Sequence, residues 1–404
     1  MARAPRALVI GGSLGGLFAA NLLLRRGWDV RVFEQSAQPL AGRGAGIITH
    51  PDLFSALEHI GINTSEGIGV DIEGRVAFAG DGSVLGTLPI RQCLTTWGRL
   101  HELLLAAFPA DRYHLGHACS SVEQDAAEVR VVFANGNEAR GELLIGADGI
   151  RSVVRAAVAP DTRPQYAGYI AWRGLAEERL LSAATRHDLF PKFAFSLAPR
   201  EHMLGYPVAG FGNSTRPGER CFNFVWYRPT DAQQELPLLC TDREGRRHDM
   251  SIPPPLLRDE VIAQMRTDAA ERLSPQFAEV VAKTRQPFFQ VIFDLESPRM
   301  NAGRIALLGD AAFVARPHVG MGVSKAAGDA MALTAALRED SDIAVALAGY
   351  SKQRACFGSA VIHHARALGA YLQAGSDPER AAAAMLHTPQ AVMRDIAVTR
   401  DYSG

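Results

Sequence analysis

The chain has little cysteine, and none of its cysteines is paired by spacing. Five occur in 404 residues, which is an odd number, and none stands in a Cys-x-x-Cys pair. We therefore expect no disulfide framework and no metal site. A free cysteine packs as a small hydrophobic residue, so we expect buried structural thiols in a reducing cytoplasm. The five are Cys93, Cys119, Cys221, Cys240 and Cys356.

An excess of either charge is also missing. The chain has 42 Lys and Arg residues against 43 Asp and Glu residues, for a formal net charge of -1. A nucleic-acid-binding protein shows a basic face, and no long run of Lys and Arg occurs here. We therefore expect a small-molecule ligand and no nucleic-acid partner. The length and the 47% apolar content suit two domains, or one large domain with a second inserted into it.

One apolar stretch, Ala7 to Leu24, carries no formal charge and follows Arg3 and Arg6. This pattern resembles a signal peptide or a short membrane span. Four glycines interrupt it between residues 11 and 16, and a second strand-like run follows directly. A buried strand, a turn and a helix explain the same composition, so we expect neither export nor membrane insertion.

The first 34 residues therefore have the pattern of a βαβ unit. Arg6 to Ile10 is predicted to be a buried strand, and Leu14 to Arg26 a helix that Gly27 ends. Trp28 to Phe33 is predicted to be the second strand, which completes a unit of about 30 residues.

Further strands are predicted on both sides of a different central region. Residues 128–133 alternate like a strand and are followed by a hairpin turn, and residues 143–145 form a short buried run. Between about 163 and 290 the chain has strand-like runs such as 222–227 and a turn-rich stretch near the prolines at 253–255. We expect this region to be a separate sheet-based domain that covers a ligand site. A buried strand at 304–308 then precedes long helical patterns to about residue 372.

The glycine turn at 11–16 is the first motif that indicates a function. Glycines let the backbone approach a pyrophosphate, which sits at the positive N-terminal end of the helix. A carboxylate about 20 residues on accepts hydrogen bonds from a ribose diol, which favours FAD or NAD over a phosphorylated ribose. A serine stands where the second glycine is usual, and a structural turn without a ligand is the alternative. The candidate residues are Gly11, Ser13, Leu14, Gly16 and Glu34.

Two further motifs follow along the chain: Gly-Ala-Asp-Gly at 146–149 and Gly-Asp-Ala-Ala at 309–312. In this order and at these separations, the three motifs resemble those of the para-hydroxybenzoate hydroxylase family of FAD-dependent aromatic monooxygenases. The resemblance extends over nearly the whole chain. It implies an α/β fold with a Rossmann-like FAD-binding domain, an inserted β-sheet substrate domain and C-terminal helices. The expected FAD-binding domain comprises residues 1–75, 97–162 and 290–404, and the substrate domain comprises residues 76–96 and 163–289.

The resemblance also assigns further FAD contacts. Asp310, at a strand end, would accept hydrogen bonds from ribitol hydroxyls, with helix capping as the alternative. A helix that begins at the turn of Gly320 and Gly322 would point its positive end at the isoalloxazine, where reduction leaves negative charge. Arg43 and Asp148 complete the expected set.

Two positions depart from the wider family. Trp97 stands where an arginine is common, and Ser324 stands where an asparagine is common.

Within the family, residues 166–174, 223–227 and 316–318 resemble enzymes that hydroxylate 2,6-dihydroxypyridine or 6-hydroxynicotinate. Such enzymes transfer oxygen from a flavin C4a-hydroperoxide to an electron-rich ring, and removing a ring hydroxyl proton assists the transfer. The resemblance makes His202, Tyr206 and His318 the catalytic candidates, and His50, Tyr206 and His318 the substrate-binding ones. A structural role is the alternative for each of them. We expect Trp172, Trp226 and Tyr227 to pack within the sheet.

The expected partners are therefore a small aromatic substrate, O2 and either NADH or NADPH, with non-covalent FAD as cofactor. No second dinucleotide motif occurs, so the sequence does not distinguish the two nicotinamides. The oligomeric state is left open, a homodimer included. A non-hydroxylating flavin reductase or oxidase, and a flavin-binding regulatory protein, are the alternative functions.

Overall fold

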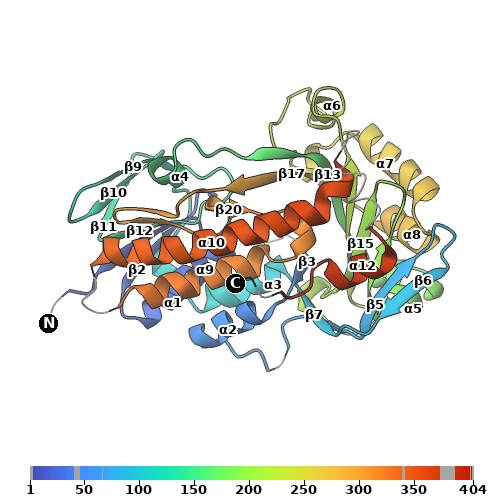
Figure 1. The fold of residues 1–404 in the computed structure, drawn as a ribbon, viewed down its shortest axis with the longest axis horizontal. Helices are drawn as coiled ribbons and strands as arrows, with labels where there is room; N and C mark the ends of the chain where they lie inside the picture. The colour runs from blue at the N-terminus through green and yellow to red at the C-terminus, as the bar shows by residue number, and fades with distance from the viewer. Residues whose placement is uncertain are drawn as a thin grey trace.

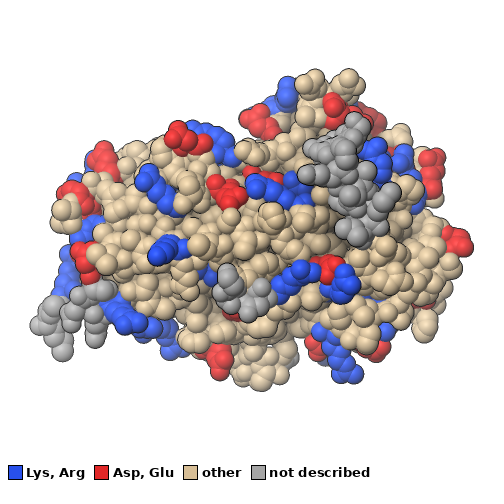
Figure 2. All heavy atoms as spheres, viewed as in Figure 1, with Lys and Arg blue, Asp and Glu red and all other residues tan. Residues whose placement is uncertain are grey.

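The computed structural model describes residues 3–40, 46–65, 67–338, 342–373, 387–400 and 402. The molecule is elongated, with a parallel sheet and its helices toward one end and a large antiparallel sheet toward the other (Figure 1). Acidic and basic side chains are interspersed over the face shown in Figure 2, in keeping with the balanced formal charge. None of the helices in the described part of the chain combines the length and apolar character needed to cross a membrane.

The parallel sheet has six strands in the order β18-β19-β12-β1-β2-β8. Every neighbouring pair is parallel except β18 with β19. The expected βαβ unit opens it: α1 (Leu14–Arg25) ends one residue before the predicted boundary, and Gly27 adopts a left-handed φ of +80°. The strands are β1 (Arg6–Ile10), β2 (Asp29–Phe33), β8 (Tyr113–His114), β12 (Leu143–Gly146), β18 (Asn301–Ala302) and β19 (Ile305–Leu307).

Helices pack around this sheet because its strands are buried on both faces. Helix α1 contacts α2, α3 and α9, and α9 also contacts α10. Two three-stranded antiparallel sheets flank the arrangement. The helices are α2 (Pro51–Ile60), α3 (Trp97–Ala106), α4 (Val154–Val158), α9 (Gly322–Ala336) and α10 (Ile343–Gly369). The small sheets are β9 (Cys119–Gln124), β10 (Val129–Phe133) and β11 (Glu138–Gly141), and β3 (Gly46–Ile48), β7 (Gln92–Thr96) and β4 (Val70–Ile72).

The second large sheet has eight strands in the order β20-β17-β13-β16-β15-β14-β5-β6. All neighbours are antiparallel except β14 with β5. It draws on strands from three separate stretches of the chain. They are β5 (Gly74–Phe78), β6 (Val84–Leu88), β13 (Gln165–Glu177), β14 (Lys192–Ser196), β15 (His202–Val208), β16 (Cys221–Pro229), β17 (Phe288–Glu296) and β20 (Phe313–Val314).

The two faces of the eight-stranded sheet have different coverings. Trp172 and Trp226 lie on one face, in the core formed with helices α5, α7 and α8. Tyr206 and Tyr227 lie on the other face, together with residues of α12. This second face looks toward the parallel sheet, so alternate residues of its strands are available to a site between the two sheets. The helices in this half of the molecule are α5 (Ala183–Leu189), α6 (Glu235–Leu239), α7 (Asp259–Arg272), α8 (Pro275–Lys283) and α12 (Pro389–Asp395).

Candidate active site

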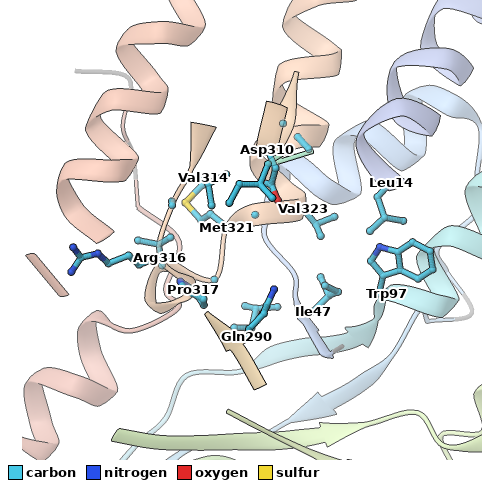
Figure 3. A pocket seen from close by; sticks show the side chains of 18 of the residues that line it. Leu14, Ile47, Trp97, Gln290, Asp310, Val314, Arg316, Pro317, Met321 and Val323 are labelled. Carbon is cyan, nitrogen blue, oxygen red and sulfur yellow. The ribbon is translucent and has the colours of Figure 1, made fainter. Parts of the chain in front are cut away.

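A cavity of about 440 Å³ lies between the parallel sheet and the face of the eight-stranded sheet that carries Tyr206 and Tyr227. The N-terminal ends of α1, α3 and α9 border it, and β13, β15, β16 and β17 close it from the other side. Leu14, Ile47 and Trp97 lie along one wall, and Gln290 points into the space from β17 (Figure 3). The cavity therefore has one end formed by the glycine motifs and another formed by sheet side chains.

The glycine turn at the first end requires a bare backbone. Gly11 has a φ of +107°, and a Cβ placed there would lie 2.2 Å from the Ala147 carbonyl oxygen. A Cβ at Gly16 would lie 1.9 Å from the Gly11 carbonyl oxygen. Ser13 precedes α1 without capping it, and no acidic residue occupies the first turn of that helix. Ser13 and Leu14 line the cavity, so the positive end of α1 is free to receive an anionic phosphate.

Glu34 lies beside this turn, where β2 ends. Its Oε2 accepts a hydrogen bond from the Gly12 amide at 2.8 Å, and its Oε1 accepts one from the Ser36 amide at 2.9 Å. The Tyr113 hydroxyl donates to the Gly12 carbonyl oxygen at 2.9 Å on the other side of the turn. Glu34 does not line the cavity, and its carboxylate holds the glycine turn through these backbone amides.

The Asp148 carboxylate is hydrogen-bonded to residues that follow it closely in the chain. Its carboxylate accepts hydrogen bonds from the Ser152 hydroxyl at 2.5 Å and from the amides of Val153 and Val154 at 2.8 and 3.2 Å. Burial raises the pKa of this carboxyl. Its neighbours Ala147 and Gly149 line the cavity, whereas Asp148 fixes the loop that carries them.

Asp310 differs, because its carboxylate makes no hydrogen bond with any described residue. It follows β19 in the short turn Gly309–Ala311 and lines the cavity (Figure 3). Burial and the nearby Asp329 raise its pKa, whereas the charge of Lys325 acts in the opposite direction. No helix is capped by Asp310, which removes the helix-capping interpretation. Its unpartnered acceptor suits a ligand that presents hydroxyl groups.

The other glycine pair lies at the start of α9. Gly320 has a left-handed φ of +65°, and its carbonyl oxygen lies 3.1 Å from the His50 Nε2. Gly322 is the first residue of α9, and a Cβ placed there would meet no protein atom within 4 Å. The N-terminal end of α9 is therefore open to the cavity, as is that of α1. The bare glycine backbones, the two helix ends and Asp310 together fit FAD. Arg43, also expected at this end, lies outside the described residues.

At the sheet end, Tyr206 is the expected residue that reaches the cavity. It is 2% exposed and stacks near Phe193, with the ring centroids 5.0 Å apart. Its hydroxyl has no hydrogen-bond partner among the described residues. Burial raises the pKa of Tyr206, and the charge of Arg173 acts against that effect. Tyr206 is therefore a neutral hydroxyl facing the site at neutral pH.

His202 and His318 share the Tyr206 face of the sheet but lie behind the cavity wall. His318 Nε2 is 3.1 Å from the Tyr169 hydroxyl, and its ring centroid is 4.2 Å from that of Tyr227. His202 Nδ1 is 3.3 Å from the Nε2 of His387. Burial holds the pKa values of His202 and His318 well below the ordinary value of 6.5, so both imidazoles are neutral.

His50 is also placed outside the cavity, contrary to the expectation that it faces the substrate. Its Nδ1 is 2.9 Å from the Thr399 hydroxyl, and its Nε2 contacts the Gly320 carbonyl oxygen. Burial lowers the pKa of His50. The ring therefore connects the turn before α9 to the C-terminal segment.

The lining residues that the sequence did not indicate include Arg173, Gln290 and Tyr227. Tyr227 packs within the core on this face of the sheet, as expected, and its ring, which lies against that of His318, also lines the cavity. Alternation along β16 puts Tyr227 and Val225 on one face, but only the assembled structure identifies that face as the ligand side. An arginine directly after four buried residues of strand β13, Tyr169–Trp172, was the available signal for Arg173.

Comparison with known proteins agrees with this geometry. Residues 166–294 match the FAD-binding-domain-like family model. The 2,6-dihydroxypyridine 3-monooxygenase of Paenarthrobacter nicotinovorans is 31% identical over 374 residues, which are 93% of each chain. The 6-hydroxynicotinate 3-monooxygenase of Bordetella bronchiseptica is 27% identical and covers 87% of this chain and 88% of its own. The structure of 2,6-dihydroxypyridine-3-hydroxylase from Arthrobacter nicotinovorans matches with a TM-score of 0.86 at 30% identity, covering 94% of this chain and 95% of its own.

The chain therefore belongs to the family of FAD-dependent aromatic monooxygenases. It is an enzyme with FAD as its cofactor, and NADH or NADPH is the reductant typical of such monooxygenases. The expected family, α/β fold class and cofactor are confirmed.

Proposed function

We propose that this enzyme hydroxylates a hydroxylated N-heteroaromatic ring, with 2,6-dihydroxypyridine as the model substrate. The observation that carries the proposal is the Tyr206 hydroxyl, which has no hydrogen-bond partner among the described residues and faces a largely apolar cavity opposite the glycine motifs. The similarity to the 2,6-dihydroxypyridine 3-monooxygenase supports the choice of ring. Bound FAD supplies electron transfer from NADH or NADPH and the delivery of one oxygen atom from O2.

The protein orients the substrate ring, forms hydrogen bonds with it and excludes water from the site. Leu204, Val225 and Ile292 form an apolar surface on which a flat ring can lie. Tyr206 stands beside that surface and can exchange a hydrogen bond with a ring hydroxyl, which assists loss of its proton. Exclusion of water by the apolar wall protects reactive species at the cofactor from wasteful decay.

We assign His202 and His318 a positioning role. Tyr227 lies between His318 and the cavity, so the imidazole orients that ring and does not touch the substrate. Both histidines are neutral, which keeps an unpaired cation out of the buried layer behind the site. We place the activity in the cytoplasm, since all five cysteines are free thiols. The proposal does not depend on a homodimer, and analytical ultracentrifugation would measure the oligomeric state.

The proposal is tested with FAD-loaded enzyme and a panel of hydroxypyridines and phenols. We expect 2,6-dihydroxypyridine to stimulate NADH or NADPH oxidation and to gain one labelled oxygen atom from ¹⁸O2. Nicotinamide consumption with unlabelled ring and hydrogen peroxide only would identify a non-hydroxylating oxidase. Absence of any flavin reduction across the panel would identify a flavin-binding regulatory protein.

Tyr206→Phe tests the residue on which the proposal depends. Loss of a group that assists proton transfer lowers hydroxylation by about 10²–10⁴-fold, and we expect a decrease in that range. Tyr166→Phe is the matched control, because the Tyr166 hydroxyl bonds the Thr230 carbonyl oxygen at 2.9 Å on the opposite face of the sheet. Equal rates for Tyr206→Phe and the unmodified enzyme would contradict the assignment.

A further inference from the structure

Arg173 is a cation at the sheet end of the cavity, and none of the described residues forms a hydrogen bond or an ion pair with it. It lies in β13 on the same face as Tyr169 and Ala171, and its register partners are Val225 in β16 and Phe288 in β17. Among the described residues, no acid or carbonyl group accepts a hydrogen bond from its guanidinium, and its Nε is buried without a partner. Its charge reaches both Tyr206 and Tyr227, where it lowers the pKa against the larger effect of burial.

The other buried arginines of the described chain each have at least one acceptor, although the Nε of Arg75 and one Nη of Arg316 also lack a partner. Arg316 also borders the cavity, but its side chain extends away from it (Figure 3) and binds Asp294 at 2.9 Å. Arg354 binds Asp329 at 2.7 Å, and Arg75 donates to backbone carbonyl oxygens of residues 393, 396 and 397. An unpaired guanidinium in such surroundings is unfavourable, because the charge loses water without gaining an acceptor. Arg173 is therefore arranged for an acceptor that arrives with a ligand.

The cavity itself offers one acid, Asp310, among its described lining residues. The charges that shift the pKa of Asp310 are those of Lys325 and Asp329. Asp310 belongs to the glycine-motif end, so it leaves the charge of Arg173 uncompensated.

We propose that Arg173 is the residue that selects the substrate, by pairing with an anionic oxygen on the aromatic ring. This inference rests on the proposed function and narrows its substrate class to rings that carry a carboxylate or a deprotonated ring hydroxyl. The planar fork of a guanidinium donates two parallel hydrogen bonds to a carboxylate and stabilises a ring oxyanion as well. An uncharged ring of the same shape leaves the cation unpaired and is rejected.

Pairing at Arg173 also prepares the ring for oxygen transfer. A cation beside a ring hydroxyl favours its deprotonated form, and the deprotonated ring is richer in electrons. Tyr206 on β15 and Arg173 on β13, two strands that β16 separates, then act on one ring from the same face of the sheet.

The test measures ligand binding to the FAD-loaded enzyme through the change in flavin absorbance. The probes are 6-hydroxynicotinate, its neutral carboxamide and 2,6-dihydroxypyridine. We expect Arg173→Met to weaken carboxylate binding by about 10–100-fold, since hydrogen bonds to charged groups have that strength, and to change carboxamide binding little. Arg173→Lys should fall between Arg173→Met and the unmodified enzyme, because it keeps the charge and loses the fork.

The pH dependence of binding shows whether the anionic oxygen that pairs with Arg173 belongs to a carboxylate or to a deprotonated ring hydroxyl. If the carboxylate is the partner, the Arg173→Met effect persists across the neutral range. If a ring oxyanion is the partner, the effect on 2,6-dihydroxypyridine grows as pH passes through the pKa of its hydroxyl. Arg140→Met is the matched control, because it removes a cation that pairs with Glu128 on the surface of a small sheet.

Equal losses for carboxylate and carboxamide, with no growth of the Arg173→Met effect on 2,6-dihydroxypyridine as pH rises, would show that Arg173 only shapes the cavity. Undiminished anion binding in Arg173→Met would show that it binds no anion. Either result overturns the inference. Such a result together with labelled product leaves the proposed function standing. Selective loss of anion binding without labelled product in the unmodified enzyme supports the role of Arg173 and overturns the hydroxylation.

Discussion

At the scale of single residues, Gly322 separates the requirements of the fold from those of the cofactor. A methyl group there meets no protein atom within 4 Å, and the residue starts a helix that borders the cavity. We expect Gly322→Ala to leave the thermal unfolding of the FAD-free protein unchanged. Added bulk against a bound molecule costs about 1–3 kcal/mol, so FAD affinity should fall by about tenfold or more. Fluorescence titration with FAD measures the change.

Gly349→Ala supplies the control. It lies within α10, also meets no atom within 4 Å, and is remote from the cavity lining. Its FAD affinity should match that of the unmodified chain. If Gly322→Ala binds FAD equally well, the flavin does not approach the start of α9.

Individual residues also show which parts of the site could be predicted from the sequence and which could not. The glycine turn and the strand-end position of Asp310 were predictable, because motif spacing specifies local backbone geometry. The surroundings of His50, His202 and His318 were not predictable, since they depend on contacts with residues 399, 387 and 169. The two-residue period of β16 assigns Tyr227 to a face, but the identity of the ligand side depends on which layer covers each face.

At the scale of elements, three histidines cluster at strands β15 and β16: His202 and His318, which are buried, and His387, which is partly buried. Burial lowers the pKa of each, and that of His387 to about 4. In the unfolded chain they take up protons near pH 6.5, whereas in the folded chain they remain neutral. The unfolded state therefore binds more protons below pH 6.5, and stability falls as pH decreases from there.

The expected dependence is about 1.4 kcal/mol per pH unit for each such histidine. Denaturant unfolding at about pH 7 and about pH 5.5 measures it, and His318→Gln should reduce the slope by the contribution of one histidine. His59→Gln controls for loss of a histidine, because His59 is exposed on α2. An unchanged slope in His318→Gln would show that His318 becomes protonated in the folded protein.

At the scale of the whole molecule, bound FAD should stabilise the two halves together, because turns that follow strands of the parallel sheet and strands of the eight-stranded sheet both line the cavity. A ligand that binds the folded state at 100 times its Kd adds about 2.7 kcal/mol of stability. We expect saturating FAD to raise the Tm, and Asp310→Ala to reduce that increase by weakening FAD binding.

The Asp310 carboxylate has no hydrogen-bond partner in the described chain, so Asp310→Ala should not lower the Tm of the FAD-free protein. Asp161→Ala, at an exposed residue of the loop before β13, is the matched loss of a carboxylate. Scanning calorimetry with and without FAD makes the comparison. An equal FAD-induced shift in Asp310→Ala would remove Asp310 from the cofactor site.

The order of strands in the two sheets has a consequence for synthesis on the ribosome. Strand β1 is made first, yet its sheet is completed by β18 and β19 at residues 301–307, and the eight-stranded sheet waits for β17 and β20 at residues 288–314. At about 5–20 residues per second, roughly 300 residues take about 15–60 seconds to emerge. During that interval the nascent chain presents unpaired edges of apolar strands, which are binding sites for chaperones and for other nascent chains. Its yield in a cell should therefore depend on chaperone supply more steeply than the stability of the finished enzyme suggests.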